Sequence, residues 1–255
     1  MQDRQTHRLE VEAFLNQKFS VHDWLFTLPH GWGNEIYFAC GGGNAYFVKL
    51  GVQIERYQVV ASLGLTPIVL ATGYLQDGMS IIVQPRIEGR NPSRIDYRTY
   101  LDQIAEVINR IHHNPELMRI LPAASSDLYA AAGLQSLTRI QQKWVRYRDQ
   151  VPEVAGFVDQ ALVELHQQVQ QFQGAGLVAS HNDICNANWL ISSDGQLYLI
   201  DLESMSLDDP ALDIGATLWW YYPLALWERF LEIVGHAKDD AFRLRMRVRM
   251  AMHCL

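Results

Sequence analysis

The sequence predicts an α+β protein of two lobes, a β-rich N-terminal lobe over residues 1–85 and a mainly helical lobe over residues 86–255. Two observations predict this division. Runs of β-prone residues separated by turn residues fill the region before Pro85, whereas long stretches with helical periodicity fill the region after it. A length of 255 residues is sufficient for two such lobes.

The N-terminal lobe is predicted to be a sheet with one helix inserted between its strands. A helix is expected over residues 11–19, and β-prone runs that flank three glycines predict a β-hairpin over residues 34–50. These glycines favour a hairpin turn over a phosphate-binding P-loop, because the G-K-[ST] ending of a P-loop is missing. Apolar residues at helical spacing predict a helix over residues 54–63, and a second strand pair follows over residues 68–84.

The second lobe is predicted to follow a linker over residues 87–92 and to be built mainly from helices. Periodicity predicts helices over residues 97–112, 127–150, 154–173 and from 212 onward, with short strands around 177–180, 189–191 and 196–200. Between Arg243 and Arg249, arginine alternates with apolar residues, which is the period of a strand. The helix-forming residue types in that run nevertheless favour a helix.

Composition excludes several classes of protein. A formal net charge of −7 argues against a protein that binds nucleic acid, because that function requires a basic surface. Three widely spaced cysteines without a C-x-x-C pair indicate reduced thiols rather than a zinc site. We find no apolar run long enough to cross a membrane and no apolar leader at the N-terminus, so a cytoplasmic protein with no membrane partner is expected. The sequence does not indicate an oligomeric state.

The segment from Ser180 to Glu203 carries the chemistry. It contains His181, Asp183 and Asn188 in the pattern H-x-D-x-x-x-x-N, followed by Asp201 at the end of an apolar strand. Phosphoryl transfer requires such a set, because catalysis consists mainly of positioning and charge neutralisation. A carboxylate must meet the acceptor hydroxyl, for which Asp183 is the candidate base, and we assign His181 to shaping the loop. An amide and a second carboxylate must hold Mg²⁺ against the phosphates, for which Asn188 and Asp201 are the candidates.

These residues, together with others along most of the chain, resemble the aminoglycoside phosphotransferase and choline kinase family, a branch of the kinase-like superfamily. The resemblance includes residues 28–34 as a loop that covers phosphates, residues 83–89 as a hinge between lobes, and residues 104–112 as a helix that ends in histidine. It also includes the segment Asp209-Pro-Ala-Leu-Asp213. The implied fold is the two-lobed, protein-kinase-like fold.

The resemblance implies roles for several further residues. Lys49 is expected to contact the α- and β-phosphates of ATP and to form an ion pair with Glu55 on the following helix. Asp213 is expected to support the catalytic loop. The remaining residues that the resemblance places at the nucleotide are Gly31, Gly33 and Asn34 in the phosphate loop, and Val83, Gln84 and Arg86 in the hinge. The implied activity is that of an ATP:alcohol phosphotransferase, which uses ATP and Mg²⁺ to phosphorylate a hydroxyl of a small molecule.

Two rival functions remain open at this point. One is an ATP-binding regulatory module, or pseudokinase, that binds the nucleotide without turnover. The other is a protein kinase, which the sequence disfavours because no A-P-E-like motif lies between Asp201 and Asp213. Activity on any small alcohol would exclude the first rival, and phosphorylation of peptides would favour the second.

An aromatic run, Trp219-Trp-Tyr-Tyr222, follows the Asp213 segment. Aromatic faces could hold a cationic acceptor there, but packing in the core of a helix is favoured for the run as a whole. The adjacent histidines at 112 and 113 are interpreted as a helix end rather than a metal site, because neighbouring residues on a helix do not face one point.

Overall fold

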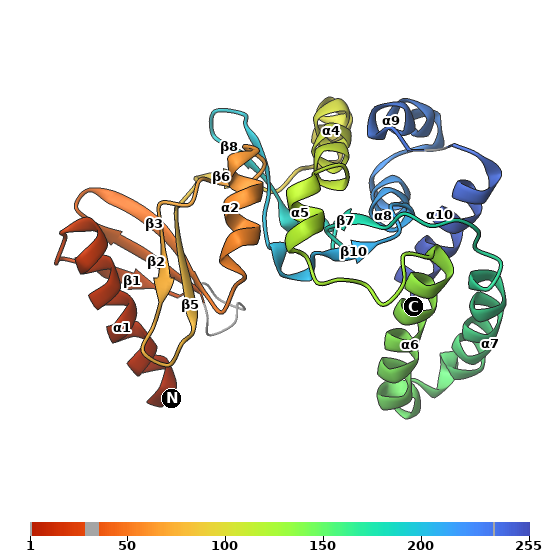
Figure 1. The fold of residues 1–255 in the computed structure, drawn as a ribbon, viewed down its shortest axis with the longest axis horizontal. Helices are drawn as coiled ribbons and strands as arrows, with labels where there is room; N and C mark the ends of the chain where they lie inside the picture. Colours follow the sequence, from red (N-terminus) through yellow and green to blue (C-terminus); the bar gives the residue numbers. More distant parts are fainter. Residues whose placement is uncertain (1, 29–35, 237) are drawn as a thin grey trace. The chain divides into compact units, whose positions relative to one another are not determined.

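The protein is described here by a computed structural model that covers residues 2–28, 36–236 and 238–255. The chain divides into two compact units. The first consists of Met1–Arg90 and Trp189–Glu203, and the second of Asn91–Asn188 and Ser204–Leu255. The predicted combination of a β-rich N-terminal region with a mainly helical remainder is confirmed (Figure 1).

A five-stranded antiparallel sheet forms the body of the first unit, with the strands in the order β1-β2-β3-β5-β4 (Figure 1). Its strands are β1 (Leu25–Thr27), β2 (Ile36–Gly41), β3 (Asn44–Leu50), β4 (Ala71–Tyr74) and β5 (Ser80–Pro85). Helix α1 (Gln2–Phe19) supplies Val11 and Leu15 to a core that also contains buried side chains of β2, β3 and β5. Helix α2 (Ile54–Ser62) lies between β3 and β4 in the chain, as the sequence predicts.

A second, three-stranded sheet corrects the predicted boundary between the lobes. It pairs β6 (Gly89–Arg90), β8 (Trp189–Ser192) and β9 (Leu197–Leu199) in the order β6-β8-β9. Residues 189–203 therefore pack with the N-terminal unit, although the sequence places them in the second lobe. The backbone explains this placement, because β8 pairs with β6 and the Leu199 amide donates to the Leu65 carbonyl at 2.8 Å. The predicted linker over residues 87–92 consequently contains a short strand.

The second unit is mainly helical. Its helices are α3 (Arg94–Thr99), α4 (Leu101–His112), α5 (Pro115–Ile120), α6 (Tyr129–Tyr147), α7 (Pro152–Val169), α8 (Ala211–Tyr221), α9 (Trp227–Val234) and α10 (Asp240–His253). The predicted helix over residues 97–112 is two helices. A capping box between Ser93 and Asp96 starts α3 at Arg94, and the chain breaks at Tyr100 before α4 begins. The sequence missed α5 and the strand β10 (Ser206–Asp208), which pairs with β7 (Val178–Ser180).

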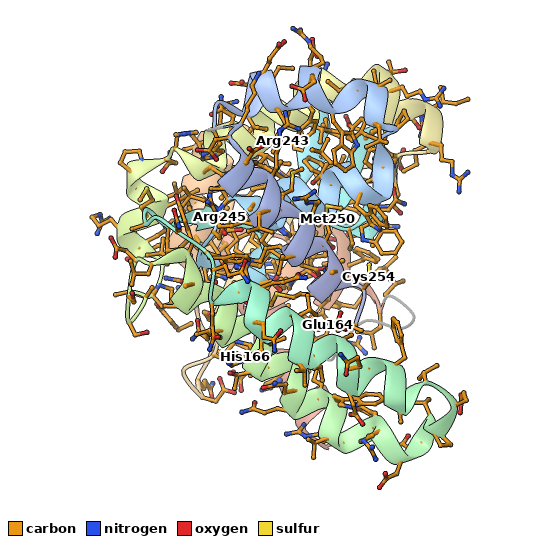
Figure 2. The ribbon with its side chains drawn as sticks, turned by 90° about the vertical axis from the view of Figure 1, so that its right-hand side faces the viewer. Glu164, His166, Arg243, Arg245, Met250 and Cys254 are labelled. Atoms are coloured by element: carbon orange, nitrogen blue, oxygen red, sulfur yellow. The ribbon has the colours of Figure 1, made fainter. Side chains whose placement is uncertain are left out.

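Helix α10 contains the arginine run, and the prediction of a helix there is confirmed. Arg245 and Arg249, four residues apart, are buried and pair with Asp209 and Asp208 respectively. Figure 2 shows α10, marked by Arg245 and Met250, beside α7, marked by Glu164 and His166, and α10 contacts both α6 and α7. The aspartates at positions 208 and 209 thus neutralise the two buried arginines and fix α10 within the helical unit.

The aromatic run at the end of α8 departs from the predicted core packing. Trp219 and Trp220 are 54% and 53% exposed, whereas Tyr222 is 5% exposed. The favoured interpretation was therefore wrong for the two tryptophans. Among the described residues, no helix is both long and apolar enough to cross a membrane.

Candidate active site

The motif H-x-D-x-x-x-x-N forms a tight loop in the helical unit, directly after the buried strand β7. A 3-10 turn over Asn186–Asn188 closes the loop. It brings Asn188 back to Asp183, and the Asn188 side-chain amide donates to the Asp183 carboxylate at 3.0 Å and to the Asp183 carbonyl at 2.8 Å. Both bonds use the amide nitrogen, so the amide oxygen of Asn188 is the atom left to meet another group. The carboxylate of Asp183 is thereby held in one orientation.

Asp213, on α8, anchors the start of this loop, as the resemblance implied. Its buried carboxylate accepts the backbone N–H groups of His181 at 2.7 Å and of Asn182 at 2.9 Å. His112 at the end of α4 lies 3.1 Å from the same carboxylate. Burial alone would raise the pKa of Asp213, but the hydrogen bond and charge of His112 lower it below its usual value. Asp213 therefore stays ionised and fixes the two residues that precede Asp183.

A third histidine extends this arrangement. His236, in the connection between α9 and α10, has its Nε2 at 3.0 Å from Nδ1 of His112. Burial, and then the nearby His112 and His113, lower the pKa of His236 to about 3. His236 is thus neutral at physiological pH. The interpretation of the 112–113 pair as a helix end is correct for its position, but the sequence did not indicate that His112 contacts the aspartate that holds the loop of Asp183.

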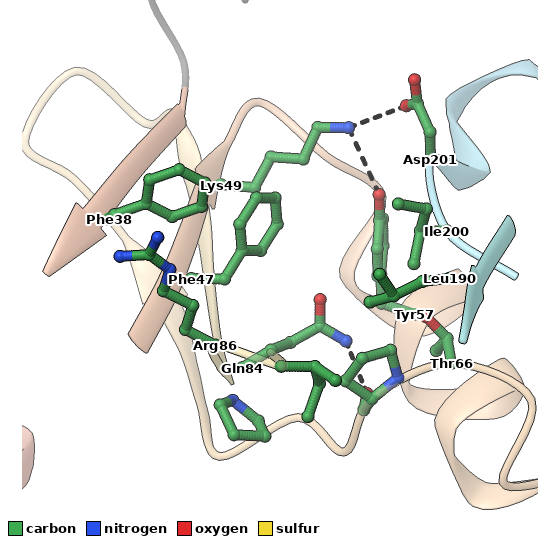
Figure 3. A pocket seen from close by; sticks show the side chains of 13 residues that line it. Phe38, Phe47, Lys49, Tyr57, Thr66, Gln84, Arg86, Leu190, Ile200 and Asp201 are labelled. Carbon is green, nitrogen blue, oxygen red and sulfur yellow. Dashed lines mark hydrogen bonds and ion pairs between the residues drawn. The ribbon is translucent and has the colours of Figure 1, made fainter. Parts of the chain in front are cut away.

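The other candidate residues gather in the first unit around Lys49 on β3. The Lys49 ammonium lies 2.8 Å from the Asp201 carboxylate and 2.6 Å from the Glu203 carboxylate. Figure 3 shows Lys49 extended between Asp201 and the Tyr57 hydroxyl, which is 3.5 Å away. The expected ion pair with Glu55 is therefore wrong. Glu55 is exposed, and among the described residues Lys49 takes its carboxylate partners from the turn after β9 instead.

Helix α2 holds this turn in place through two neighbouring residues. The Arg56 guanidinium donates to the carbonyls of Leu202 at 2.6 Å and Glu203 at 2.8 Å, and the Tyr57 hydroxyl donates to the Glu203 carboxylate at 2.7 Å. The sequence alone does not indicate these roles for Arg56, Tyr57 or Glu203. Glu203 could have been predicted as a site residue, because it lies two residues after the candidate Asp201. The sequence around Arg56 and Tyr57 contains no pattern that indicates a role at the site.

Burial raises the pKa of two groups in this cluster, Glu203 and Tyr57. Burial, followed by a hydrogen bond with Asp201, raises the pKa of Glu203, although Lys49 and Tyr57 oppose the rise. Burial and the neighbouring charge of Glu203 raise the pKa of Tyr57, which keeps its hydroxyl as a donor. Asp201 has a φ of 60°, a left-handed conformation that is costly for a residue other than glycine and that is often found at functional sites.

A cavity of about 230 Å³ lies beside Lys49 within the first unit (Figure 3). Phe38 and Phe47 form part of its walls, and it extends to Lys49 and Asp201 at its polar end. Two of the hinge residues expected at the nucleotide, Gln84 and Arg86, line it. Gln84 is fixed by a 2.5 Å hydrogen bond from its amide to the Pro67 carbonyl, and the Arg86 guanidinium lies 4.3 Å from the Phe38 ring centroid.

Of the other expected nucleotide contacts, only Val83 belongs to the described residues. The Val83 side chain is fully buried in the core of the sheet, and its carbonyl accepts the Leu70 amide at 2.8 Å. Val83 therefore does not line the cavity. Gly31, Gly33 and Asn34 lie outside the described residues. Within the described part of the chain, no three His, Cys, Asp or Glu side chains form a metal cluster.

The first unit is β-rich and carries a lysine on β3. The helical unit carries a loop that is anchored by a buried aspartate. Together these features define a protein of the kinase-like class. A model of the phosphotransferase enzyme family matches residues 27–251. The chain belongs to this family.

Solved structures of the same fold include kinases of small molecules. A spectinomycin phosphotransferase in complex with ADP and spectinomycin aligns with a TM-score of 0.70 and 14% identity, covering 94% of this chain and 83% of that one. A choline kinase from Streptococcus pneumoniae aligns with a TM-score of 0.65 and 17% identity, covering 98% of this chain and 88% of that one. An aminoglycoside phosphotransferase in complex with AMP-PNP and hygromycin B aligns with a TM-score of 0.65 and 21% identity, covering 96% and 88%.

Proposed function

We propose that the protein is an ATP:alcohol phosphotransferase that moves the γ-phosphoryl group of ATP to a hydroxyl of a small molecule. The observation that carries the proposal is the catalytic loop. Asn188 orients the Asp183 carboxylate, and the buried Asp213 fixes the backbone before it. The family membership and the small-molecule kinases of the same fold support this reading.

In this reaction Asp183 acts as the base. It accepts the proton of the acceptor hydroxyl while the hydroxyl oxygen forms a bond to the γ-phosphorus. The bond from that phosphorus to the bridging oxygen breaks, and ADP leaves with the electron pair. His181 contributes through its backbone, because its N–H is bound by Asp213 and its side chain is fully buried. It therefore shapes the loop rather than transferring a proton.

The donor atoms of the two units fit Mg²⁺. This ion prefers carboxylate and amide oxygens and retains water and phosphate ligands, so a closed cluster of protein side chains is not required. Asn188 has its amide oxygen available, and the Asp201 side chain is 51% exposed. We propose that Asn188 and Asp201 hold Mg²⁺, which neutralises charge on the phosphates when it is bound.

The cavity beside Lys49 suits a nucleotide. Phe38 and Phe47 offer flat apolar surfaces to the adenine ring of ATP. Lys49, at the polar end of the cavity, carries the positive charge that the phosphates require. Within this proposal Gln84 and Arg86 border the adenine ring. Gly31, Gly33 and Asn34 are proposed, from the family resemblance, to cover the phosphates.

We place this activity in the cytoplasm, where ATP is available. Cys40, Cys185 and Cys254 form no disulfide in the described structure, in keeping with a reducing compartment.

The test is ADP release by the purified protein with ATP and Mg²⁺ on a panel of amino alcohols, sugars, hydroxy acids and aminoglycosides. We expect turnover on at least one class. Asp183→Asn should lower kcat by at least about a hundredfold, because a positioned base contributes that much or more. Asp194→Asn, at an exposed carboxylate in the turn after β8, is the matched control and should leave kcat unchanged.

The alternative is an ATP-binding regulatory module without turnover. A rise in melting temperature with AMP-PNP, combined with no ADP release on any acceptor, would favour that alternative. Turnover that survives Asp183→Asn would instead refute the assignment of the base.

A further inference from the structure

A larger cavity, of about 600 Å³, lies within the helical unit. It is bordered by α6 and α10 and by the catalytic loop, which it meets at Asn182, the residue directly before Asp183. The Asn182 side chain is itself fixed there, because its amide donates to the Ser206 hydroxyl at 2.7 Å. The cavity thus reaches the loop that carries the proposed base, at the residue that precedes it in the chain.

The charge of this cavity is unusual for the protein. Its lining contains three cationic side chains, of which Arg139 and Lys143 are exposed and Arg249 is buried, against one acidic side chain, Asp208. Asp208 is already neutralised by its ion pair with Arg249. Arg139 and Lys143 form no ion pair with any of the described residues. In a chain with a net charge of −7, this lining is thus locally positive.

The two uncompensated cations are presented together. Arg139 and Lys143 are four residues apart on α6, which places them on one face of the helix. The same face carries Trp144 and Tyr147, which offer apolar surface to the cavity. Burial, and then the positive charge of Arg139, lower the pKa of Arg249 to about 10. The positive charge of Arg139 therefore disfavours the charged form of Arg249, and an anion bound near both would offset this effect.

We propose that this cavity binds the acceptor and that the acceptor is an anionic alcohol, a small hydroxylated molecule with a carboxylate or phosphate group held by Arg139 and Lys143. The inference rests on the proposed function, whose acceptor class it names. The apolar face of Trp144 and Tyr147 contacts the carbon skeleton, and the hydroxyl is presented to Asp183. A cationic acceptor is disfavoured, because it would enter a lining that already carries unpaired positive charge.

The experiment compares matched acceptors that differ in charge. ADP release is measured with glycerol, glycerate and glycerol 3-phosphate, with glucose, glucuronate and glucose 6-phosphate, and with choline and ethanolamine. We expect kcat/KM to be highest for anionic members of a set. Arg139→Glu and Lys143→Glu should each lower it by at least tenfold. Arg146→Glu is the matched control, because Arg146 is exposed on α6 and does not line the cavity, and it should leave kcat/KM within twofold.

A second measurement does not depend on turnover. Acetylation of Lys143 by an amine-directed reagent is followed by mass spectrometry with and without 10 mM inorganic phosphate or glycerate. We expect protection of Lys143 by at least one of these anions and none of the exposed Lys18. The preferred anion distinguishes a phosphate from a carboxylate as the recognised group. Arg139→Glu should abolish the protection.

The outcomes separate this inference from the proposed function. Turnover of neutral or cationic alcohols that is unchanged or increased by Arg139→Glu would overturn the anionic acceptor and leave the phosphotransferase standing. Protection of Lys143 without turnover on any alcohol would support the anion site and count against the phosphotransferase. Absence of protection by both anions would overturn the site.

Discussion

At the scale of single residues, the turn Asp201-Leu-Glu203 presents two carboxylates to one lysine. Lys49 lies within 2.8 Å of both, and Tyr57 holds Glu203 with a further hydrogen bond. Because Glu203 also forms an ion pair with Lys49, Asp201 is not the only carboxylate that neutralises the lysine among the described residues. If Asp201 binds Mg²⁺ as proposed, Glu203 remains as a carboxylate partner that holds Lys49.

Glu203→Gln should therefore weaken the use of ATP. We expect kcat/KM for ATP to fall about tenfold or more, because a hydrogen bond to a charged group contributes about 1.5–3 kcal/mol. Glu55→Gln provides the contrast. Glu55 is exposed and forms no pair with Lys49, so its amide variant should match the unchanged protein within twofold. A larger loss for Glu55→Gln than for Glu203→Gln would show that the active enzyme pairs Lys49 differently.

At the scale of elements, buried ion pairs fix α10 against the last residue of β10 and the residue that follows it. Arg249 is fully buried, pairs with Asp208 and donates to the Ser136 hydroxyl at 2.9 Å. Arg249→Met should lower the free energy of unfolding by about 3–5 kcal/mol, because it leaves a buried carboxylate without its cation. Urea denaturation measures this loss.

Two further variants make that prediction specific. Combining Arg249→Met with Asp208→Leu removes both charges and should recover much of the lost stability, since no unpaired charge remains. Arg247→Ala, at an exposed position of the same helix, should change stability by no more than about 0.5 kcal/mol. Equal losses in the single and double variants would mean that packing, and not the ion pair, fixes α10.

The elements also show what the sequence could predict. Alternation and turn residues correctly predicted the hairpin of β2 and β3, and helical spacing predicted α2 to within one residue. Short elements such as α5 and β10 were missed, because a few residues carry no periodicity. The loop with Asp183 and Asn188 was predictable because these two residues lie close in sequence. The partner of Lys49 was not, because Asp201 and Glu203 are contributed across a long sequence separation and Glu55 is the nearer acidic residue.

At the scale of the whole molecule, the N-terminal unit is discontinuous. After Asn188 the chain leaves the helical unit and forms the hairpin of β8 and β9, which pairs with β6. The residues after β9 supply the carboxylates of Asp201 and Glu203 to Lys49, and the chain re-enters the helical unit at Ser204. Trp189 and Leu199 on this hairpin are fully buried. The N-terminal unit therefore depends on residues that follow it by about a hundred positions, and its folding requires closure of that long loop.

This dependence predicts how fragments behave. A fragment of residues 1–85 lacks the partners of Leu65 and Arg56, whose bonds to Leu199, Leu202 and Glu203 would be lost. We expect it to unfold without a cooperative transition. A chain that joins residues 1–90 to residues 189–203 through a short Gly/Ser linker restores these contacts, because Arg90 pairs with Ile191 in an antiparallel register that a short turn can span. That chain should unfold cooperatively and be stabilised by AMP-PNP, both measured by circular dichroism on heating. Equal cooperativity in the two fragments would show that the N-terminal sheet with α1 and α2 folds without the hairpin, and that β8 and β9 serve only to deliver Asp201.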